Sequence, residues 1–158
     1  MNKIKSLRLK YRVKSHGDDL FAALRENPHD WDTFAILGDW LEEQGDPTAE
    51  VVRDVIMKEE DPEGISIRFD LTMERQSLRE RVIDLVSCIE RDQEEINSWK
   101  INFEANVEEY SEDVVEDQIE ELELRLKHFM DEHEDIARQI TLIDRLLEKL
   151  HPNQVKPV

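Results

Sequence analysis

The chain has 158 residues, of which 38% are charged, and its formal net charge is −18. Apolar residues occur in every segment, which is typical of a folded, soluble protein, yet no run approaches the roughly 20 apolar residues that cross a bilayer. The single cysteine, Cys88, excludes an intrachain disulfide and a thiolate-rich metal site. The start of the chain lacks the apolar core of a secretion signal, so we expect a cytoplasmic protein.

Residues 1–14 are predicted to form a basic strand or arm. They contain six Lys or Arg residues and no acid, so the rest of the chain carries −24. A body this acidic repels phosphate backbones and anionic membranes, and nucleic-acid binding could therefore come only from this arm. From residue 6 to residue 14, apolar and basic residues alternate with the period of a strand. The apolar face is a candidate interaction surface, for pairing within the chain or with another chain: Leu7, Leu9, Tyr11 and Val13.

Residues 15–60 are predicted to form a small unit of three short helices. The first must stop before Pro28, because the residue that precedes a proline avoids the helical conformation. The second ends at Gly45, the residue type that best tolerates a left-handed helix terminus. Asp46 is expected to cap the third helix, with a proline at its first position. A unit of this size is too small to bury a large core alone.

Part of this unit resembles a known family. Residues 38–47 read GDWLEEQGDP, and AEVVR follows at residues 49–53. Over residues 19–53 the chain is similar to the small "repeat-companion" domain, a module of bacterial proteins often found beside leucine-rich repeats, with the signature A-D-W-L-E-E-x-G-D-P. The chain has Gly38 where that family usually has alanine, and no leucine-rich repeats follow. The resemblance implies a helical unit and implies no activity.

The acidic residues beside Trp40 have two interpretations. Asp39, Glu42 and Glu43 lie within one helical turn and could form an acidic active site or a cation site. We favour a structural interpretation, in which Trp40 packs inward and anchors the unit while the acids pair with arginines. Of the two arginines near enough in sequence, we expect Arg53 rather than Arg25 to be the partner. The predicted structural residues of the unit are therefore Trp40, Asp46 and Arg53.

Residues 61–71 are predicted to form a turn followed by a second strand. The turn signal is Asp61-Pro62-Glu63-Gly64, and the residues after it alternate between apolar and polar. This strand could pair with the first one into a small ribbon. Because two strands alone are marginally stable, either the helices cover the ribbon or a neighbouring chain extends it.

Residues 72–151 are predicted to form a long antiparallel helical hairpin, a coiled coil, with a loose tail at 152–158. Two apolar seams repeat at spacings of three and four residues, the period of supercoiled helices. The helices would run from about residue 71 to 107 and from about 112 to 150, and residue numbers that face each other would sum to about 218. Asp92 and His133 interrupt the seams and are expected to fix the register. The seams comprise Leu78, Val82, Leu85, Ile89, Asp92, Ile96, Trp99 and Phe103, and Val115, Ile119, Leu122, Leu126, Phe129, His133, Ile136, Ile140, Ile143, Leu147 and Leu150.

Two further patterns give weak indications of chemistry. His128 and Glu132 are four residues apart and could hold a metal, but two ligands at one spacing favour a structural or exposed role. Cys88 flanks the seam, and nothing local supplies the base that a nucleophilic thiol needs. No glycine lies in a phosphate-cradling loop. The sequence thus indicates no catalytic, cofactor-binding or metal site.

Apolar residues off the seams indicate a contact beyond the hairpin itself, because a helix that is apolar over more than a narrow stripe needs a third neighbour. These candidate interaction residues are Ile83, Val86, Ile101, Leu124, Leu142 and Leu146. We therefore expect a mainly α, non-enzymatic protein that acts in protein–protein interaction or assembly, with another protein or a second copy as partner and no membrane or cofactor. The alternative is an acidic decoy that mimics nucleic acid and inhibits a nucleic-acid-binding protein.

Overall fold

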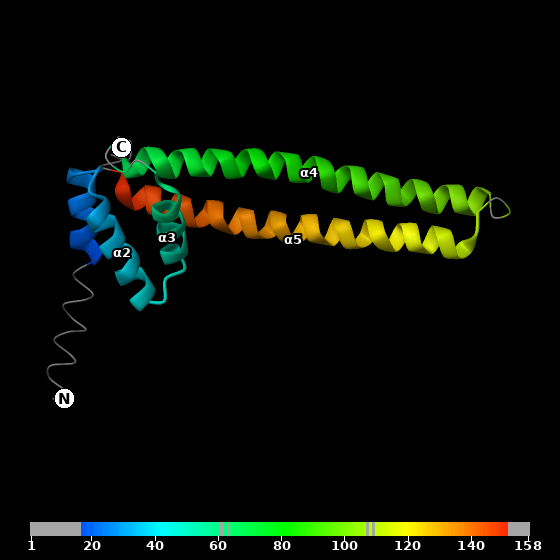
Figure 1. Cartoon of the computed structure of the whole chain (residues 1–158), viewed down its shortest axis with the longest axis horizontal. Coiled ribbons are helices and arrows are strands. Elements are labelled where there is room, and N and C mark those ends of the chain that lie inside the picture. Colours follow the sequence, from blue (N-terminus) through cyan, green and yellow to red (C-terminus); the bar gives the residue numbers. More distant parts are fainter. Residues whose placement is uncertain (1–16, 61, 63, 107, 109, 152–158) are drawn as a thin grey trace, which may run out of the picture. The chain divides into compact units, whose positions relative to one another are not determined.

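The computed structural model describes residues 17–60, 62, 64–106, 108 and 110–151. Residues 17–26 are helical, and the helices α2 (Trp31–Glu43), α3 (Thr48–Lys58), α4 (Ile67–Ala105) and α5 (Glu112–Leu150) follow (Figure 1). The described part of the chain contains no strand. Within the same residues, no helix combines the length and the apolar character needed to span a membrane.

The chain divides into two compact units, which we describe separately. The head unit comprises the described residues up to Gln76 together with those from Gln139 onward, and the hairpin unit comprises Ser77–Arg138. Each of the two long helices contributes one of its ends to the head unit and its remainder to the hairpin unit.

In the head unit, both ends of α2 follow from local side-chain and backbone chemistry. Asp30 caps the beginning, where its Oδ1 atom accepts a hydrogen bond from the backbone N–H of Thr33 at 3.0 Å. At the other end Gly45 has a φ of +68°, and the N–H of Asp46 reaches back to the carbonyl of Leu41 at 2.9 Å. This left-handed glycine with its backward hydrogen bond satisfies carbonyl groups that the helix end would otherwise leave free. The predicted end of the second helix at Gly45 is confirmed.

Asp46 then prepares the start of α3. Its Oδ1 atom accepts hydrogen bonds from the backbone N–H of Thr48 at 3.0 Å and from the Thr48 hydroxyl at 2.8 Å. Because Thr48 is the first residue of α3, this carboxylate satisfies a backbone donor that has no partner within the helix. The capping role predicted for Asp46 is confirmed.

The prediction of a second strand at residues 65–71 is wrong. Residues 67–71 form the first turns of α4, and the hydroxyl of Ser66, just before them, caps this helix by accepting a hydrogen bond from the N–H of Phe69 at 3.1 Å. Ile67 and Leu71 are 1% and 0% exposed, whereas Phe69 is 56% exposed. Residues spaced by four lie on one face of a helix and also on one face of a strand, so alternation alone did not distinguish the two. The first predicted strand lies outside the described residues, and the structure does not support a ribbon.

The last turns of α5 complete the core of the head unit. Ile143 belongs to the predicted seam and Leu146 lies beside it, and both are 1% exposed. In Figure 1 this end of α5 lies against α2 and α3. Leu142 and Leu146, predicted as interaction residues, are therefore buried within their own chain, and that assignment is corrected. Their position off the seam implied packing against an element other than the partner helix of the hairpin. This element is the set of short helices.

The hairpin unit consists of residues 77–105 of α4 and 112–138 of α5, which pack against each other as an antiparallel pair (Figure 1). Every seam residue in this unit is buried or half-buried. The observed helices, Ile67–Ala105 and Glu112–Leu150, differ from the predicted limits by at most four residues. The helical hairpin is confirmed.

Candidate interaction surface

The hairpin unit contains one buried charged side chain among its described residues, Asp92, which is 0% exposed. Arg125 on α5 binds it with two hydrogen bonds, from Nε to Oδ2 at 2.9 Å and from Nη2 to Oδ1 at 2.7 Å. These hydrogen bonds hold the pKa of Asp92 below its usual value, although burial acts in the opposite direction. The carboxylate therefore remains ionised inside the seam. Its buried negative charge is stabilised only if a cation occupies the matching position of the facing helix.

Glu132, one of the two residues weighed above as a metal ligand, is bound instead by Arg81. The guanidinium donates two hydrogen bonds to the Glu132 carboxylate, at 3.0 and 3.2 Å. Among the described residues, no group of three or more His, Cys, Asp or Glu side chains is arranged to hold a metal ion. The bidentate contact gives Glu132 a structural role between α4 and α5.

In the head unit, Trp40 is half-buried and packs on Gly17. A Cβ atom added to Gly17 would lie 2.4 Å from the Trp40 ring, so a side chain larger than hydrogen does not fit there. Arg53 forms an ion pair with Glu42, as predicted, and about half of each side chain is exposed. Trp40 thus contacts the first helix directly, while the Arg53 pair lies at the surface and contributes little to stability.

Gly38 provides a second close approach between helices. A Cβ atom added to it would lie 2.8 Å from Cγ1 of Val52, a fully buried residue of α3. The helices α2 and α3 therefore pack more closely at this point than an alanine would permit. This accounts physically for the glycine at the position where the repeat-companion signature has alanine.

An acidic group lies where α3 approaches the start of α4. Burial raises the pKa of Asp70 to about 6, and a hydrogen bond with Glu59 and the negative charges of Glu59 and Glu74 act in the same direction. Lys58 partly balances this charge by donating a hydrogen bond to Glu74 at 2.9 Å.

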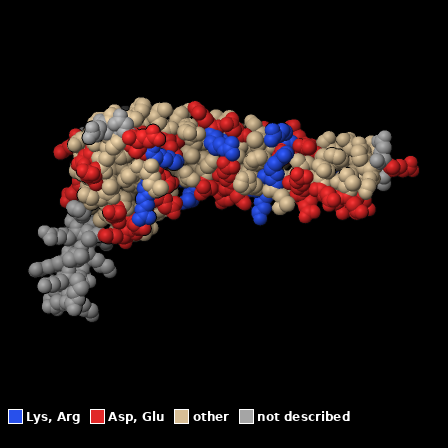
Figure 2. Space-filling view, viewed as in Figure 1, with Lys and Arg blue, Asp and Glu red and all other residues tan. Residues whose placement is uncertain are grey.

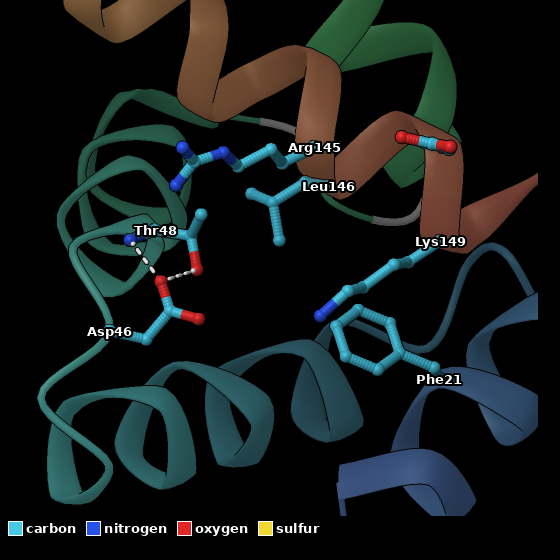
Figure 3. A pocket seen from close by; sticks show the side chains of 7 residues that line it. Phe21, Asp46, Thr48, Arg145, Leu146 and Lys149 are labelled. Atoms are coloured by element: carbon cyan, nitrogen blue, oxygen red, sulfur yellow. Dashed lines mark hydrogen bonds between the residues drawn. The ribbon is translucent and has the colours of Figure 1, made fainter.

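The head unit also has a hollow of about 290 Å³ beside the last turns of α5. Figure 3 shows Arg145 and Lys149 extending from α5 along this hollow, with the Lys149 amino group over the ring of Phe21. The Lys149 Nζ atom lies 5.0 Å from the ring centroid, within the range of a cation–π contact. Asp46 on the opposite side is engaged by Thr48. The contact between Lys149 and Phe21 joins α5 to the short helices. We therefore interpret the hollow as a gap in the packing of the head unit rather than as a binding site.

The remaining predicted interaction residues are exposed but scattered. Ile83 and Ile101 are 66% and 64% exposed and are 18 residues apart on α4, which places them on the same face but about 27 Å from each other. Val86 and Leu124 are also exposed. Single exposed apolar residues are ordinary on protein surfaces, so these four do not define a contact surface by themselves. Leu7, Leu9, Tyr11 and Val13 lie outside the described residues.

A more concentrated surface occurs at the tip of the hairpin, where α4 joins α5. Trp99 and Tyr110 form an edge-to-face pair with ring centroids 6.0 Å apart. With Glu95, Ser98 and Asn102 they line a hollow of about 220 Å³. Tyr110 is 39% exposed although it is aromatic. An exposed aromatic ring beside a hollow is a common feature of surfaces that bind other proteins.

The charge of the hairpin unit is concentrated at this tip. Residues 93–121 contain eleven acidic residues and one basic residue, whereas the rest of the unit contains nine acidic and six basic residues. On the face drawn in Figure 2, the end where the two long helices join shows acidic and uncharged side chains but no Lys or Arg. No salt bridge among the described residues involves an acid between residues 104 and 121. The hairpin tip therefore carries a hollow lined by two aromatic rings and by polar side chains, within a region of unbalanced negative charge.

Sequence reasoning missed several of these residues for identifiable reasons. Trp99 was assigned to the seam and Tyr110 to the connection, so nothing in the pattern joined them. Arg125 could have been found, since the predicted register places it one residue from the position opposite Asp92. The unusual glycine at 38 was a signal of close packing, but only the tertiary contact with Val52 explains it.

The chain was compared with protein-family models, curated proteins and solved structures, and nothing in the three comparisons matches it.

Proposed function

We propose that this chain is a non-enzymatic protein that acts in protein–protein interaction or assembly, with the tip of the helical hairpin as its contact surface. The observation that carries this proposal is the hollow beside Trp99 and Tyr110, which lies within a region of ten net negative charges. An exposed aromatic hollow favours association, and a surrounding field of one sign selects the partner and speeds its approach. A cytoplasmic location remains part of the proposal.

The head unit has a structural role in this proposal. We also propose that residues 19–53 form a module of the repeat-companion type. The turn at Gly45 and the cap at Asp46, both within the matching motif, support this assignment because they explain why the motif requires those residue types. The contacts of Trp40 with Gly17 and of Arg53 with Glu42 further support packing as the role of the motif.

The proposed function can be tested by reciprocal affinity purification of the full chain from its native host, with quantitative mass spectrometry. The comparison is between the wild type and Tyr110→Ser, which removes an exposed ring of the hollow. We expect the same protein, or the chain itself, to be retained in both directions by the wild type and lost with Tyr110→Ser. Leu124→Ser, which changes an exposed apolar residue away from the tip, serves as the matched control. Retention that is equal for the wild type and both variants would contradict a role for the tip.

A second function, an acidic decoy for a nucleic-acid-binding protein, is favoured by the same unpaired acids of residues 104–121. Regularly spaced carboxylates on a rod-like helix pair can imitate the charge of a phosphate backbone. In this case the retained partner should be a nucleic-acid-binding protein, and added DNA or RNA should release it from the chain. A partner that nucleic acid does not displace would exclude the decoy.

A further inference from the structure

The hollow at the hairpin tip faces one side of the hairpin. Glu95, Ser98 and Asn102 follow each other on α4 at spacings of three and four residues, so they form one strip along the helix. Ser98 precedes the seam residue Trp99 by one position, and Val114 precedes the seam residue Val115 in the same way. In an antiparallel pair, residues at equal offsets from the two seams lie on the same side.

Val114 therefore extends the apolar surface of this side onto α5. It is 52% exposed, whereas its neighbour Val115 is 2% exposed in the seam. Ile101 lies on a different face, because one residue along a helix corresponds to a rotation of about 100° from Asn102. The apolar part of the surface thus consists of Trp99, Tyr110 and Val114, and Ile101 is outside it.

The charges around this surface specify the chemistry of what it can bind. Glu95 lines the hollow itself, and among the residues that the structure describes its ion-pair partner is Arg125, at 3.9 Å. Lys100 is the single basic residue between positions 93 and 121. An acidic or phosphate-bearing partner would meet uncompensated repulsion here. The complementary partner is a segment that combines several cations with apolar side chains at close spacing.

The chain itself carries such a segment in residues 1–14. Four of its six Lys or Arg residues alternate with Leu7, Leu9, Tyr11 and Val13, and no acid interrupts them. Apolar side chains at every second position can cover the rings of the hollow. The Lys and Arg side chains between them leave the opposite face of an extended segment, but they are long enough to bend back to the flanking carboxylates. Cations near the faces of Trp99 and Tyr110 would gain a further cation–π attraction.

We propose that the hollow at the hairpin tip, together with Val114, binds residues 1–14 of a second copy of this chain. This inference rests on the proposed function and names its partner. Because each copy carries both the segment and the surface, the contact can be reciprocal and close as a dimer, or can continue from copy to copy. Salt weakens the association, since the opposed charges are exposed and therefore screened.

The partner segment can be identified directly by site-specific photo-crosslinking. A benzophenone amino acid replaces Tyr110 in the full chain, and light and ¹⁵N-labelled copies are mixed before irradiation. We expect mass spectrometry to find crosslinks from position 110 of one isotopic form to residues 1–14 of the other. Crosslinks to another segment, or only within one isotopic form, would overturn the inference.

A matched pair of neighbouring charge substitutions tests whether the hollow itself is responsible. Asn102→Arg places a cation in the hollow, and Ile101→Arg makes a comparable addition of one positive charge on the adjacent position, outside the hollow. Sedimentation equilibrium of the full chain between 1 and 100 µM measures the self-association constant of each variant. Circular dichroism confirms that the helix content is unchanged. We expect Asn102→Arg to weaken self-association by about tenfold, through repulsion of the basic segment. Ile101→Arg should remain within about twofold of the wild type, because long-range charge effects are screened.

Equal weakening by the two substitutions, or a wild type that stays monomeric at 100 µM in low salt, would overturn the inference. Failure of the inference is distinguishable from failure of the proposed function. If residues 1–14 are not crosslinked but Tyr110→Ser still loses a reciprocally purified protein, the tip is an interaction surface for a different partner. If neither experiment depends on the tip, both proposals are wrong.

Discussion

Arg125 encloses the carboxylate of Asp92 with two hydrogen bonds of 2.9 and 2.7 Å, in the middle of an otherwise apolar seam. Asp92 is 0% exposed, while about half of the Arg125 side chain remains in contact with solvent. A shifted register would bury the carboxylate against an apolar side chain, and the loss of its partner would be costly. The pair therefore favours one alignment of α4 and α5 over its neighbours, as a polar seam residue commonly does.

Arg125→Met should destabilise the hairpin unit substantially. The substitution leaves the buried Asp92 carboxylate with only a longer ion pair, to Arg91 at 3.7 Å. We expect a loss of about 3 kcal/mol in the free energy of unfolding, the lower end for a buried pair that loses one partner. Urea unfolding followed by circular dichroism, together with hydrogen exchange of residues 77–138, measures it. Arg79→Met, an exposed arginine on α4, is the control. If the two variants lose the same stability, the ion pair does not select the register.

The same pair predicts the behaviour of the protein in acid. Because the folded pKa of Asp92 lies below its usual value, its contribution to stability is complete above about pH 4 and is lost as the pH falls through the lowered pKa. Asp92→Asn should therefore be less stable than the wild type at pH 7, and the difference should shrink below about pH 4. Thermal unfolding at pH 7, 4 and 2.5 tests this. A difference that is constant over this range would contradict the ionised state of Asp92.

Asp70 should have the opposite effect on pH dependence. Its pKa of about 6 in the folded chain exceeds the ordinary value of 3.8, so the unfolded chain releases this proton at lower pH. The free energy of unfolding should consequently fall as the pH rises from about 4 to about 6. Asp70→Asn should remove this fall, which we expect to be under about 1 kcal/mol because the group is only partly buried and solvent screens it. Asp39→Asn, at an exposed aspartate of the same unit, is the matched control.

Gly38→Ala tests the close approach of α2 and α3. In an exposed helix this change stabilises by about 1 kcal/mol, because alanine has the higher helix propensity. Here the added methyl group meets Val52, and we expect a net loss of about 1 to 3 kcal/mol, as for other overpacked sites. Val52→Ala should recover part of this loss in a double-mutant cycle, whereas Val55→Ala should not. A stabilising Gly38→Ala would show that the helices are farther apart than described.

Trp40→Ala should be more damaging than the loss of either acid that follows it, Glu42 or Glu43. Trp40 is half-buried against Gly17, so we expect a loss of about 3 kcal/mol, the lower end for a core aromatic residue. Glu42→Ala and Glu43→Ala should each cost under about 1 kcal/mol, because exposed acids and exposed ion pairs contribute little. Urea unfolding of the head unit, monitored by tryptophan-independent circular dichroism, compares the three. Acid substitutions as damaging as the tryptophan change would instead indicate a buried polar site.

Much of the helical architecture could be predicted, because the signals that define it are local or strictly periodic. Gly45 and Asp46 mark a helix end and a helix start through their own backbone and side-chain chemistry. The seams define α4 and α5 because a sustained spacing of three and four residues is compatible only with helices. The stretch at residues 65–71 was misassigned because its apolar residues satisfy both periods, and the decisive cap at Ser66 is a single weak signal.

The candidate site was predicted less well, for a related reason. Off-seam position identified Leu142 and Leu146 as residues that need another neighbour, but it could not say that the head unit of the same chain provides it. It likewise ranked Ile101 above Tyr110, although only the fold brings Tyr110 to Trp99.

By itself, the sequence determined most of the helices, the end of α2 at Gly45, the antiparallel hairpin and the uneven distribution of charge. These properties depend on residues near one another in the chain or on a repeat that continues along it. Only the tertiary structure decided which apolar residues off the seams are buried, that Arg125 is the partner of Asp92, and that the hairpin tip carries an aromatic hollow. These features depend on side chains from distant segments, and their contact is set by how closely helices pack, which no single segment encodes.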